Sequence, residues 1–231
     1  AIAARLFPAA DVAELYGASE TSFITVNRRG PVDDDPGCVG EPFPDVELQI
    51  RPRPEDDPEH GLVYVRSPFL FEGYVEDGAV VPGVPEDGFV TVGDIGTIRA
   101  DGALSLRGRA SNLVITGGKN VHPEEIEIVL VAHDDVAECV IVGVPHPYWG
   151  EQLVACVAAV PGAEVRDEEL RDFLRTRLAV YKIPKRWLVV DRLPHLPGGK
   201  IDRQAVRRVA VADADAEPTP ASASAPDSAA R

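Results

Sequence analysis

Two different patterns of apolar and polar residues divide the chain. In the first half, short runs rich in β-branched residues, at positions 46–50, 62–67 and 89–92, alternate with segments of proline, glycine and acidic residues. Runs of this length between turn residues predict strands. Residues 97–109 predict a hairpin, because the Asp-Gly pair at their centre favours a tight turn between two strands.

The second half has the pattern of helices and longer buried strands. Pro123 is predicted to be the first residue of a helix, since proline fits that position and the glutamates after it favour the positive end of the helix dipole. Asp167 is predicted to cap a second helix, and Asp202 to begin a third. One face of the second helix would carry Leu170, Phe173, Leu174 and Leu178. Continuous apolar runs predict three more strands, at residues 136–144, 153–160 and 187–190.

These elements predict an α+β fold in two parts. Residues 1–110 would be the β-rich end of a large N-terminal domain, and residues 111–212 a small, mobile α+β domain. Residues 213–231 contain nothing apolar larger than alanine and are predicted to be a disordered tail. The segment 76–88 is predicted to be rich in turns, and the acidic stretch 33–35 to be a solvated turn.

Charge and composition narrow the function. The 231 residues carry a net charge of -15, which argues against a nucleic-acid partner, because binding a phosphate backbone needs a basic surface. No apolar run is long enough for a transmembrane segment. The three cysteines are widely spaced and predict neither a disulfide framework nor a metal knuckle, so a cytoplasmic location is expected.

Two short segments in the first half carry candidate chemistry. Tyr16-Gly17-Ala18-Ser19-Glu20-Thr21 places a hydroxyl and a carboxylate at a glycine turn, a combination suited to a phosphate and Mg²⁺. A helix cap is the plainer explanation of its Ser-Glu pair. Asp94, at the end of a strand, is suited to accept the hydroxyls of a ribose, with Arg109 near it. The plainer explanation is a turn aspartate with a weak surface ion pair.

Two more segments lie in the second half. The paired Gly117 and Gly118 let a ligand approach the backbone closely, or simply form a flexible loop. His122 and the glutamates after it lack the two-histidine helical spacing of a zinc site. Residues 193–203 form a proline- and glycine-rich loop that presents Lys200. Because the surrounding segment is strongly basic, it could collect a small polyanion such as a nucleotide or CoA, or be a solvated cationic face.

The order of these segments resembles the C-terminal half of the adenylate-forming enzymes, in particular the AMP-forming acyl-CoA synthetases. The shared pattern is YGxSE, then GD, a DG hairpin, GR, the run GG–N–HPEEIE, and finally LP–GK–R, over about residues 6–209. The resemblance implies three substrates or cofactors besides the acid: ATP, Mg²⁺ and CoA. It also implies two reactions, formation of an acyl-adenylate and its conversion to a thioester.

The resemblance implies a role for each matching residue. Tyr16 and Gly17 would lie beside the adenine, Ser19 would contact the phosphate of AMP, and Glu20 would bind Mg²⁺ and take part in catalysis. Asp94 and Arg109 would hold the ribose, and Ser111 would be the hinge. Gly117 and Gly118 would line the pantetheine tunnel, and Lys200 would be the catalytic lysine of adenylation. Leu196 replaces the threonine that is usual in that loop.

One part of the family pattern is missing. The chain contains no glycine- and hydroxyl-rich phosphate loop with a lysine, which in the family lies upstream of the first segment. We therefore expect a C-terminal fragment whose partner is the missing N-terminal domain and which does not complete adenylation alone. Two alternatives stay open: an adenylation domain that loads a carrier protein, and a non-catalytic or split-enzyme subunit that docks on a separate N-terminal chain.

Overall fold

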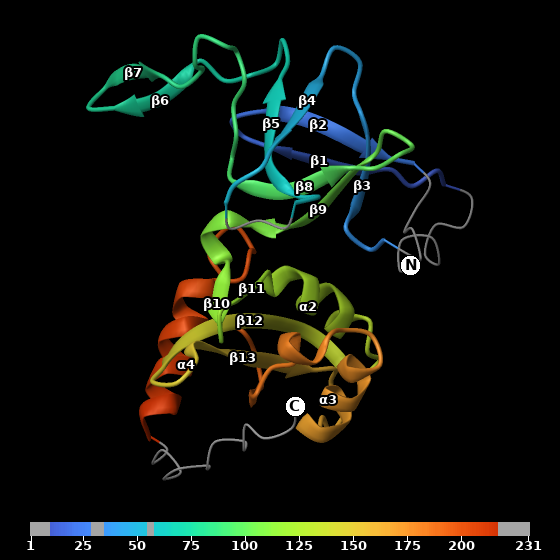
Figure 1. Cartoon of the computed structure of the whole chain (residues 1–231), viewed down its shortest axis with the longest axis vertical. Helices are drawn as coiled ribbons and strands as arrows, with labels where there is room; N and C mark the ends of the chain where they lie inside the picture. Colours follow the sequence, from blue (N-terminus) through green and yellow to red (C-terminus); the bar gives the residue numbers. More distant parts are fainter. Residues whose placement is uncertain (1–9, 29–34, 55–57, 217–231) are drawn as a thin grey trace, which may run out of the picture.

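The computed structural model describes residues 10–28, 35–54 and 58–216, which form two bodies joined by a short connection (Figure 1). The first body is built on a seven-stranded sheet in which every neighbouring pair is antiparallel. In spatial order its strands are β1 (Glu14–Ala18), β2 (Ser22–Asn27), β3 (Cys38–Pro42), β9 (Leu104–Arg109), β8 (Asp94–Ile98), β5 (Gly61–Arg66) and β4 (Glu47–Arg51).

Most of the strands predicted in this body are present. β4 and β5 correspond to the runs at 46–50 and 62–67, and β8 and β9 form the hairpin predicted around the Asp-Gly turn. The prediction at 89–92 was wrong, because within that run only Val90 pairs, in a single bridge to Val65. The apolar run is explained by burial rather than by sheet formation, since Phe89 and Val90 are both buried.

Two segments predicted as turns have more structure. Residues within 76–88 contribute to a separate hairpin of β6 (Gly73–Glu76) and β7 (Ala79–Pro82), visible at the upper left of Figure 1. Of the acidic stretch 33–35, Asp35 is the residue that the structure describes. Its carboxylate binds Arg99 at 2.6 Å and accepts a hydrogen bond from the Ser105 hydroxyl at 2.9 Å. Asp35 therefore ties the start of β3 to the β8–β9 hairpin instead of lying in a solvated turn.

The second body is a sheet with helices on both faces. β12 (Val136–His146) pairs antiparallel with β13 (Gly150–Ala159), and β13 pairs in parallel with β14 (Arg186–Val190). A small hairpin of β10 (Val114–Thr116) and β11 (Lys119–Val121) joins β13 at one residue pair. The helices are α2 (Pro123–Val131), α3 (Asp167–Arg175) and α4 (Arg203–Ala216), with a short 3-10 turn at Val180–Lys182.

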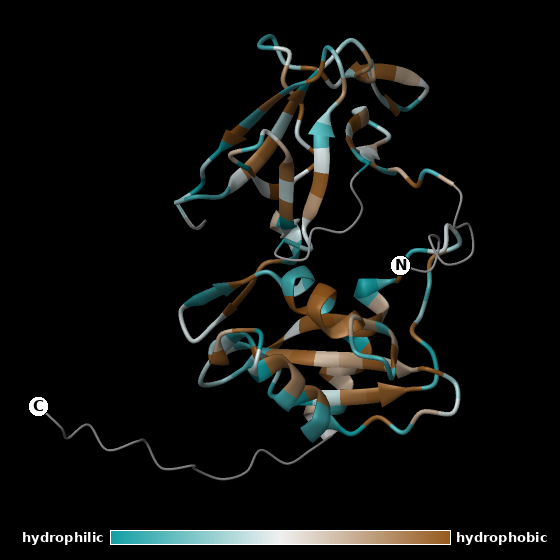
Figure 2. Ribbon diagram, turned by 90° about the vertical axis from the view of Figure 1, so that its right-hand side faces the viewer, coloured by the Kyte–Doolittle hydropathy of each residue, from teal (hydrophilic) through white to brown (hydrophobic). Residues whose placement is uncertain are grey.

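The long apolar runs are explained by burial on both faces of this sheet. Cys139 and Ile141 of β12 pack in one cluster with residues of α2 and α3, whereas Val140 and Val142 pack in another with α4. Successive residues of a strand point to opposite faces, so a strand covered on both sides has no polar alternation. The long strands of the lower body are accordingly mostly hydrophobic in Figure 2.

The helix boundaries differ from the predictions at several places. Pro123 begins α2 as predicted, and Asp202 precedes α4, where its carboxylate accepts a hydrogen bond from the Ala205 backbone at 2.9 Å. Asp167 does not cap α3; it is the first helical residue, after Arg166. The helix ends at Arg175, so Leu178 packs on the core from outside it.

Another difference concerns the predicted tail. α4 continues to Ala216, so the first four residues of the segment 213–231 are helical. Asp213 contributes to this ordering, because Arg186 of β14 forms an ion pair with its carboxylate at 2.5 Å and donates to its backbone oxygen at 2.7 Å. The rest of the predicted tail lies outside the described residues. Among those that are described, no helix is long and apolar enough to cross a membrane.

The core of the second body gives a direct stability prediction. Ile141 of β12 is fully buried in the cluster that includes residues of α2 and α3. We expect Ile141→Ala to lower the free energy of unfolding by about 2–5 kcal/mol, because the substitution leaves a cavity. Urea denaturation measures this change. Ile115 of β10, which is 51% exposed, is the matched control, and Ile115→Ala should cost about 0.5 kcal/mol or less. Equal losses in the two variants would contradict the placement of this core.

Candidate active site

The YGASET segment forms the end of β1 and the turn that leads to β2. β1 ends at Ala18, and the backbone N–H of Thr21 donates to the Ala18 carbonyl at 3.2 Å, which closes the turn. No helix follows, so the helix-cap explanation of the Ser-Glu pair was wrong. A glycine is required at position 17 because β1 and β2 lie close together there: a Cβ would be 2.0 Å from the Ser22 carbonyl oxygen. The turn thus presents Ser19 and Glu20 at the end of a rigid hairpin.

Asp94 is the centre of a polar triad with Tyr16 and Arg109. The Tyr16 hydroxyl donates to one carboxylate oxygen of Asp94 at 2.6 Å, and Arg109 Nε donates to the other at 3.0 Å. Asp94 and Arg109 face each other across the β8–β9 hairpin, and the Asp94 side chain is 9% exposed. The triad therefore holds one buried carboxylate in a fixed orientation, and each oxygen keeps a second lone pair for a ligand hydroxyl.

The surroundings of Tyr16 keep its hydroxyl protonated. Burial raises the pKa of Tyr16 well above its usual value, and the adjacent Asp94 carboxylate raises it further. Arg109 acts in the opposite direction with a smaller effect. Tyr16 is consequently a hydrogen-bond donor to Asp94 at any physiological pH and fixes that carboxylate in place.

Lys200 belongs to the second body, yet it lines the same cavity as residues of the YGASET segment in the first body. A cavity of about 470 Å³ is lined by Gly17, Ala18, Ser19, Glu20, Tyr74, Thr91, Val92, Gly93, Arg109 and Lys200. A larger cleft of about 1080 Å³ between the two bodies is lined by residues that include Tyr16, Asp94, Arg109, Ser111 and Lys200. A cation, a carboxylate and a hydroxyl from distant parts of the chain thus share one polar cavity.

The loop that carries Lys200 is closed by its own backbone. The N–H of Leu196 donates to the Lys200 carbonyl at 2.8 Å, and the N–H of Asp202 donates to the Pro194 carbonyl at 2.8 Å. His195 and Ile201 pair in a single antiparallel bridge. The loop is therefore a short hairpin-like projection that extends from the second body toward the first.

Glu20 is the candidate ligand for Mg²⁺. Tyr74 of β6 donates a hydrogen bond to its carboxylate at 3.4 Å, and the residue lines the cavity together with Ser19. Within the described part of the chain, no group of three or more His, Cys, Asp or Glu side chains is arranged to hold a metal. A single carboxylate still fits Mg²⁺, which commonly takes one or two carboxylates and completes its shell with substrate phosphates and water.

Ser111 and the pair Gly117 and Gly118 do not line the cavity of Ser19 and Glu20. Ser111 lies in a 3-10 turn, η1 (Ala110–Asn112). This turn connects β9, which belongs to the sheet of the first body, to β10, which belongs to the sheet of the second body. Gly117 and Gly118 form the turn of the β10–β11 hairpin rather than a flexible loop, with φ of +56° and +72°. They line neither of the two cavities described above, and Gly117 packs against Trp149. The structure therefore brings Lys200, and not the glycine pair, to the Ser19 and Glu20 cavity.

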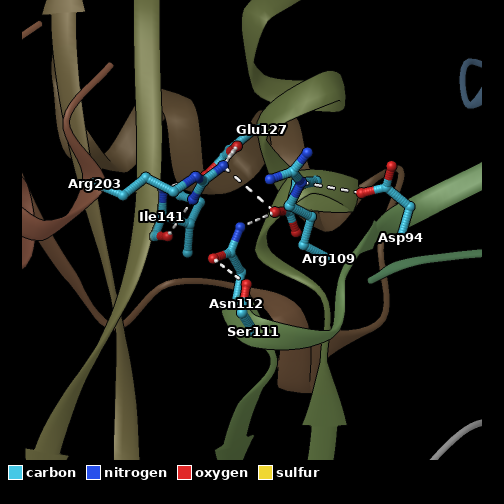
Figure 3. A network of polar contacts seen from close by, with 8 residues as sticks. Asp94, Arg109, Ser111, Asn112, Glu127, Ile141 and Arg203 are labelled. Atoms are coloured by element: carbon cyan, nitrogen blue, oxygen red, sulfur yellow. Dashed lines mark hydrogen bonds and ion pairs between the residues drawn. The ribbon is translucent and has the colours of Figure 1, made fainter. Parts of the chain in front are cut away.

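Several residues around the site were not foreseen. Tyr74 lines the cavity, and nothing in its local sequence singles it out. A polar network beneath the loop of Lys200 joins Glu124 and Glu127 of α2 to Arg203 of α4 (Figure 3). The signal for this network was the charge pattern, since HPEEIE and GKIDR each carry charges at the start of a helix.

Comparisons with known proteins identify the family of this chain. The sequence matches two family profiles, "AMP-binding enzyme" over residues 2–75 and "AMP-binding enzyme C-terminal domain" over residues 125–200. It is 36% identical over 208 residues to the uncharacterized acyl-CoA ligase YhfT of Bacillus subtilis. The matched region covers 89% of this chain and 41% of that protein.

Solved structures give the same result. ATP-bound MatB from Rhodopseudomonas palustris superimposes with a TM-score of 0.72 at 33% identity, over 86% of this chain and 40% of that one. The amide bond synthetase McbA from Marinactinospora thermotolerans superimposes with a TM-score of 0.76 at 33% identity, over 91% and 44%.

The chain belongs to the adenylate-forming, AMP-binding superfamily. Within that superfamily its curated relatives include acyl-CoA ligases, and the α+β fold predicted from the sequence is confirmed. The chain spans about 40% of the length of these relatives.

Proposed function

We propose that this chain is the C-terminal part of an AMP-forming acyl-CoA ligase, which converts a carboxylic acid, ATP and CoA into acyl-CoA, AMP and pyrophosphate. The observation that carries the proposal is the shared cavity of Lys200, Ser19, Glu20 and Arg109. A phosphate-sized anion in such a cavity would meet a lysine ammonium, an arginine and a hydroxyl, together with the one carboxylate suited to a magnesium ion.

The first half-reaction is the one that this arrangement fits. A carboxylate oxygen of the acid attacks the α-phosphorus of ATP, the bond to the bridging oxygen breaks, and pyrophosphate leaves. Negative charge builds up on the phosphoryl oxygens, and the Lys200 ammonium would stabilise it. When Mg²⁺ is bound at Glu20, it neutralises phosphate charge. Ser19 would donate its hydroxyl to the α-phosphate, and the product is an acyl-adenylate.

The nucleoside would be held by the triad. Asp94 would accept hydrogen bonds from the ribose hydroxyls, with Arg109 and Tyr16 keeping its carboxylate oriented. Tyr16, next to Gly17, would also pack beside the adenine. These contacts would position the α-phosphate for attack.

The second half-reaction requires a different placement of the small body, residues 111–212. A rotation about Ser111 would withdraw Lys200 and bring the turn of Gly117 and Gly118 over the adenylate. The thiolate sulfur of CoA then attacks the acyl carbon, the bond to the AMP oxygen breaks, and AMP leaves. Two productive states of one hinge would thus serve two half-reactions.

The proposal includes a partner for this chain. Because the chain spans about 40% of its relatives and holds no glycine-rich phosphate loop, we propose that an N-terminal domain of the same enzyme supplies that loop and most of the acid pocket. The carboxylic acid would then be chosen mainly by residues outside this chain.

A panel of carboxylic acids tests the proposal. The full-length enzyme is assayed with each acid for pyrophosphate release, first without CoA and then with it. At least one acid is expected to release pyrophosphate in the first assay and to give acyl-CoA and AMP in the second. Release of AMP with a carrier protein but not with CoA would favour the carrier-loading alternative, and no release with any acid would contradict the proposal.

The triad of Tyr16, Asp94 and Arg109 gives a second test of the proposed function. In the full-length enzyme, Asp94→Asn keeps the shape of the side chain but removes the charge that binds Arg109 and the ribose, so we expect the KM for ATP to rise by about 10–100-fold. Steady-state pyrophosphate release at varied ATP measures it. Asp101, an exposed aspartate at the β8–β9 turn, is the matched control, and Asp101→Asn should leave the KM unchanged. An unchanged KM in Asp94→Asn would remove the triad from ATP binding.

A further inference from the structure

A set of polar contacts connects the loop of Lys200 to helix α2 (Figure 3). Arg203 is the first residue of α4 and lies three residues after Lys200. Its guanidinium forms an ion pair with Glu127 and donates to the Ile141 carbonyl of β12 at 3.3 Å. Glu127 also accepts a hydrogen bond from the Ile141 backbone at 2.7 Å. Arg203 is therefore fixed to both α2 and β12 at the base of the loop.

The environment of Glu127 makes this contact costly to lose. Its side chain is 13% exposed, and burial raises the pKa of its carboxyl group, whereas Arg203 lowers it. A buried carboxylate without its cation would have to take up a proton or draw in water. The pair thus fixes both partners, and through Arg203 it fixes the point from which the loop projects.

Glu124 extends the contacts to the connection between the two bodies. Asn112 of η1 donates to its carboxylate at 2.5 Å, and Arg203 lies 3.7 Å from the same oxygen. The second oxygen of Glu124 lies against Gly108 of β9, where a Cβ would come within 2.3 Å of it. One carboxylate on α2 therefore touches the proposed hinge, the end of the first sheet and the anchor of the Lys200 loop.

We propose that Arg203 is a positioning residue for adenylation: its contacts with Glu127 and Glu124 hold the Lys200 loop in the orientation that places Lys200 in the Ser19 and Glu20 cavity. This inference rests on the proposed function, because it assigns Arg203 an effect that acts through Lys200. Glu124 would couple the loop to η1, since Asn112 and Arg203 share it.

The two half-reactions separate this role from a purely structural one. In the full-length enzyme, Arg203→Gln is expected to slow single-turnover acyl-adenylate formation by about 10–100-fold, as displaced catalytic groups do. Thioester formation from pre-made acyl-adenylate and CoA should change by less than about threefold, because that half-reaction does not use Lys200. Equal losses in the two half-reactions would show that the ion pair only stabilises the fold, and would overturn the proposal.

Arg207 offers a matched control on the same helix. Its Nε donates to the Gly143 carbonyl of β12 at 2.9 Å, so it makes a similar contact one turn further along α4, away from the loop. Arg207→Gln should leave the ratio of the two half-reaction rates unchanged. A selective loss of adenylation in Arg207→Gln as large as that in Arg203→Gln would also overturn the proposal, because any weakening of α4 would then suffice.

A double-mutant cycle gives the sharpest form of the test. If Arg203 acts through Lys200, then Arg203→Gln should have almost no further effect on adenylation in a Lys200→Ala background. An additional tenfold loss in that background would contradict the proposal. The cycle also separates the two hypotheses: a Lys200→Ala enzyme with normal adenylation contradicts the proposed role of Lys200 itself, whereas a slow Lys200→Ala enzyme beside a normal Arg203→Gln enzyme contradicts only the role of Arg203.

Two milder variants keep the proposal testable if Arg203→Gln does not fold. Arg203→Lys keeps the charge but loses the planar, multi-contact geometry of the guanidinium, and it should show a smaller selective loss of adenylation. Glu127→Gln removes the buried charge and should act in the same direction. Circular dichroism and thermal unfolding verify that each variant is folded. Folded variants without selective loss would overturn the proposal.

Discussion

Replacing Lys200 with alanine in the full-length enzyme is expected to slow acyl-adenylate formation by about 10²–10³-fold, the range typical for the loss of one group that stabilises a developing oxyanion. Lys200 lines the cavity together with Ser19, Glu20 and Arg109, and it is the residue there that comes from the second body. Single-turnover formation of acyl-adenylate, followed with labelled ATP, measures the effect.

The second half-reaction provides the internal control. Thioester formation from pre-made acyl-adenylate and CoA should stay within about threefold of the unmodified enzyme in Lys200→Ala, because the leaving group and the attacking thiol do not need the lysine. Lys119 of β11 lines neither of the two cavities, and Lys119→Ala should leave adenylation unchanged. Equal loss in both half-reactions of Lys200→Ala would remove Lys200 from its proposed role.

The sequence predicted the components of this site better than their arrangement. The order of the segments was sufficient to find the family, because each segment keeps the residue types that its chemistry needs. That Lys200 lines the same cavity as Ser19 depends on how the two bodies sit against each other. Side chains of more than one sequence segment set that placement, and no local pattern encodes it.

The difference between a local sequence pattern and the packing of the whole fold also explains the errors in the predicted strands. The strand predicted at residues 89–92 failed because burial of Phe89 and Val90 requires apolar side chains without requiring strand pairing. The β6–β7 hairpin was missed because its turn signals were stronger than its short exposed strands. In β12 and β13 the apolar runs were long enough to predict buried strands correctly, since both faces of the sheet are covered.

Charged networks were the least predictable part. Asp35 was assigned to an exposed turn although it binds Arg99 and Ser105, which lie far away in the sequence. The pairing of Arg203 with Glu127 likewise joins residues 76 positions apart. A charge that is solvated and a charge that is paired across the fold look the same in a sequence, so only the structure separates them.

Gly117→Leu in the full-length enzyme is expected to have the opposite selectivity to Lys200→Ala. We expect thioester formation to slow by about 100-fold, as a displacement of about 1 Å near the reacting atoms can do, with adenylation little changed. Gly117 has a φ of +56°, which a leucine adopts only with strain, and its Cβ would lie 2.9 Å from the Trp149 ring. The turn of the β10–β11 hairpin would therefore move, and the leucine would occupy the space proposed for pantetheine.

Gly102 separates the backbone effect from the effect on the tunnel. It also has a positive φ, +84°, at the β8–β9 turn, and no atom lies within 4 Å of a Cβ there. Gly102→Leu should therefore introduce similar backbone strain without a selective loss of either half-reaction. Both half-reactions are measured in both variants, with acyl-adenylate supplied for the second. Unimpaired thioester formation in a folded Gly117→Leu enzyme would show that this turn does not line the path of CoA, because a leucine cannot share that space with a pantetheine chain.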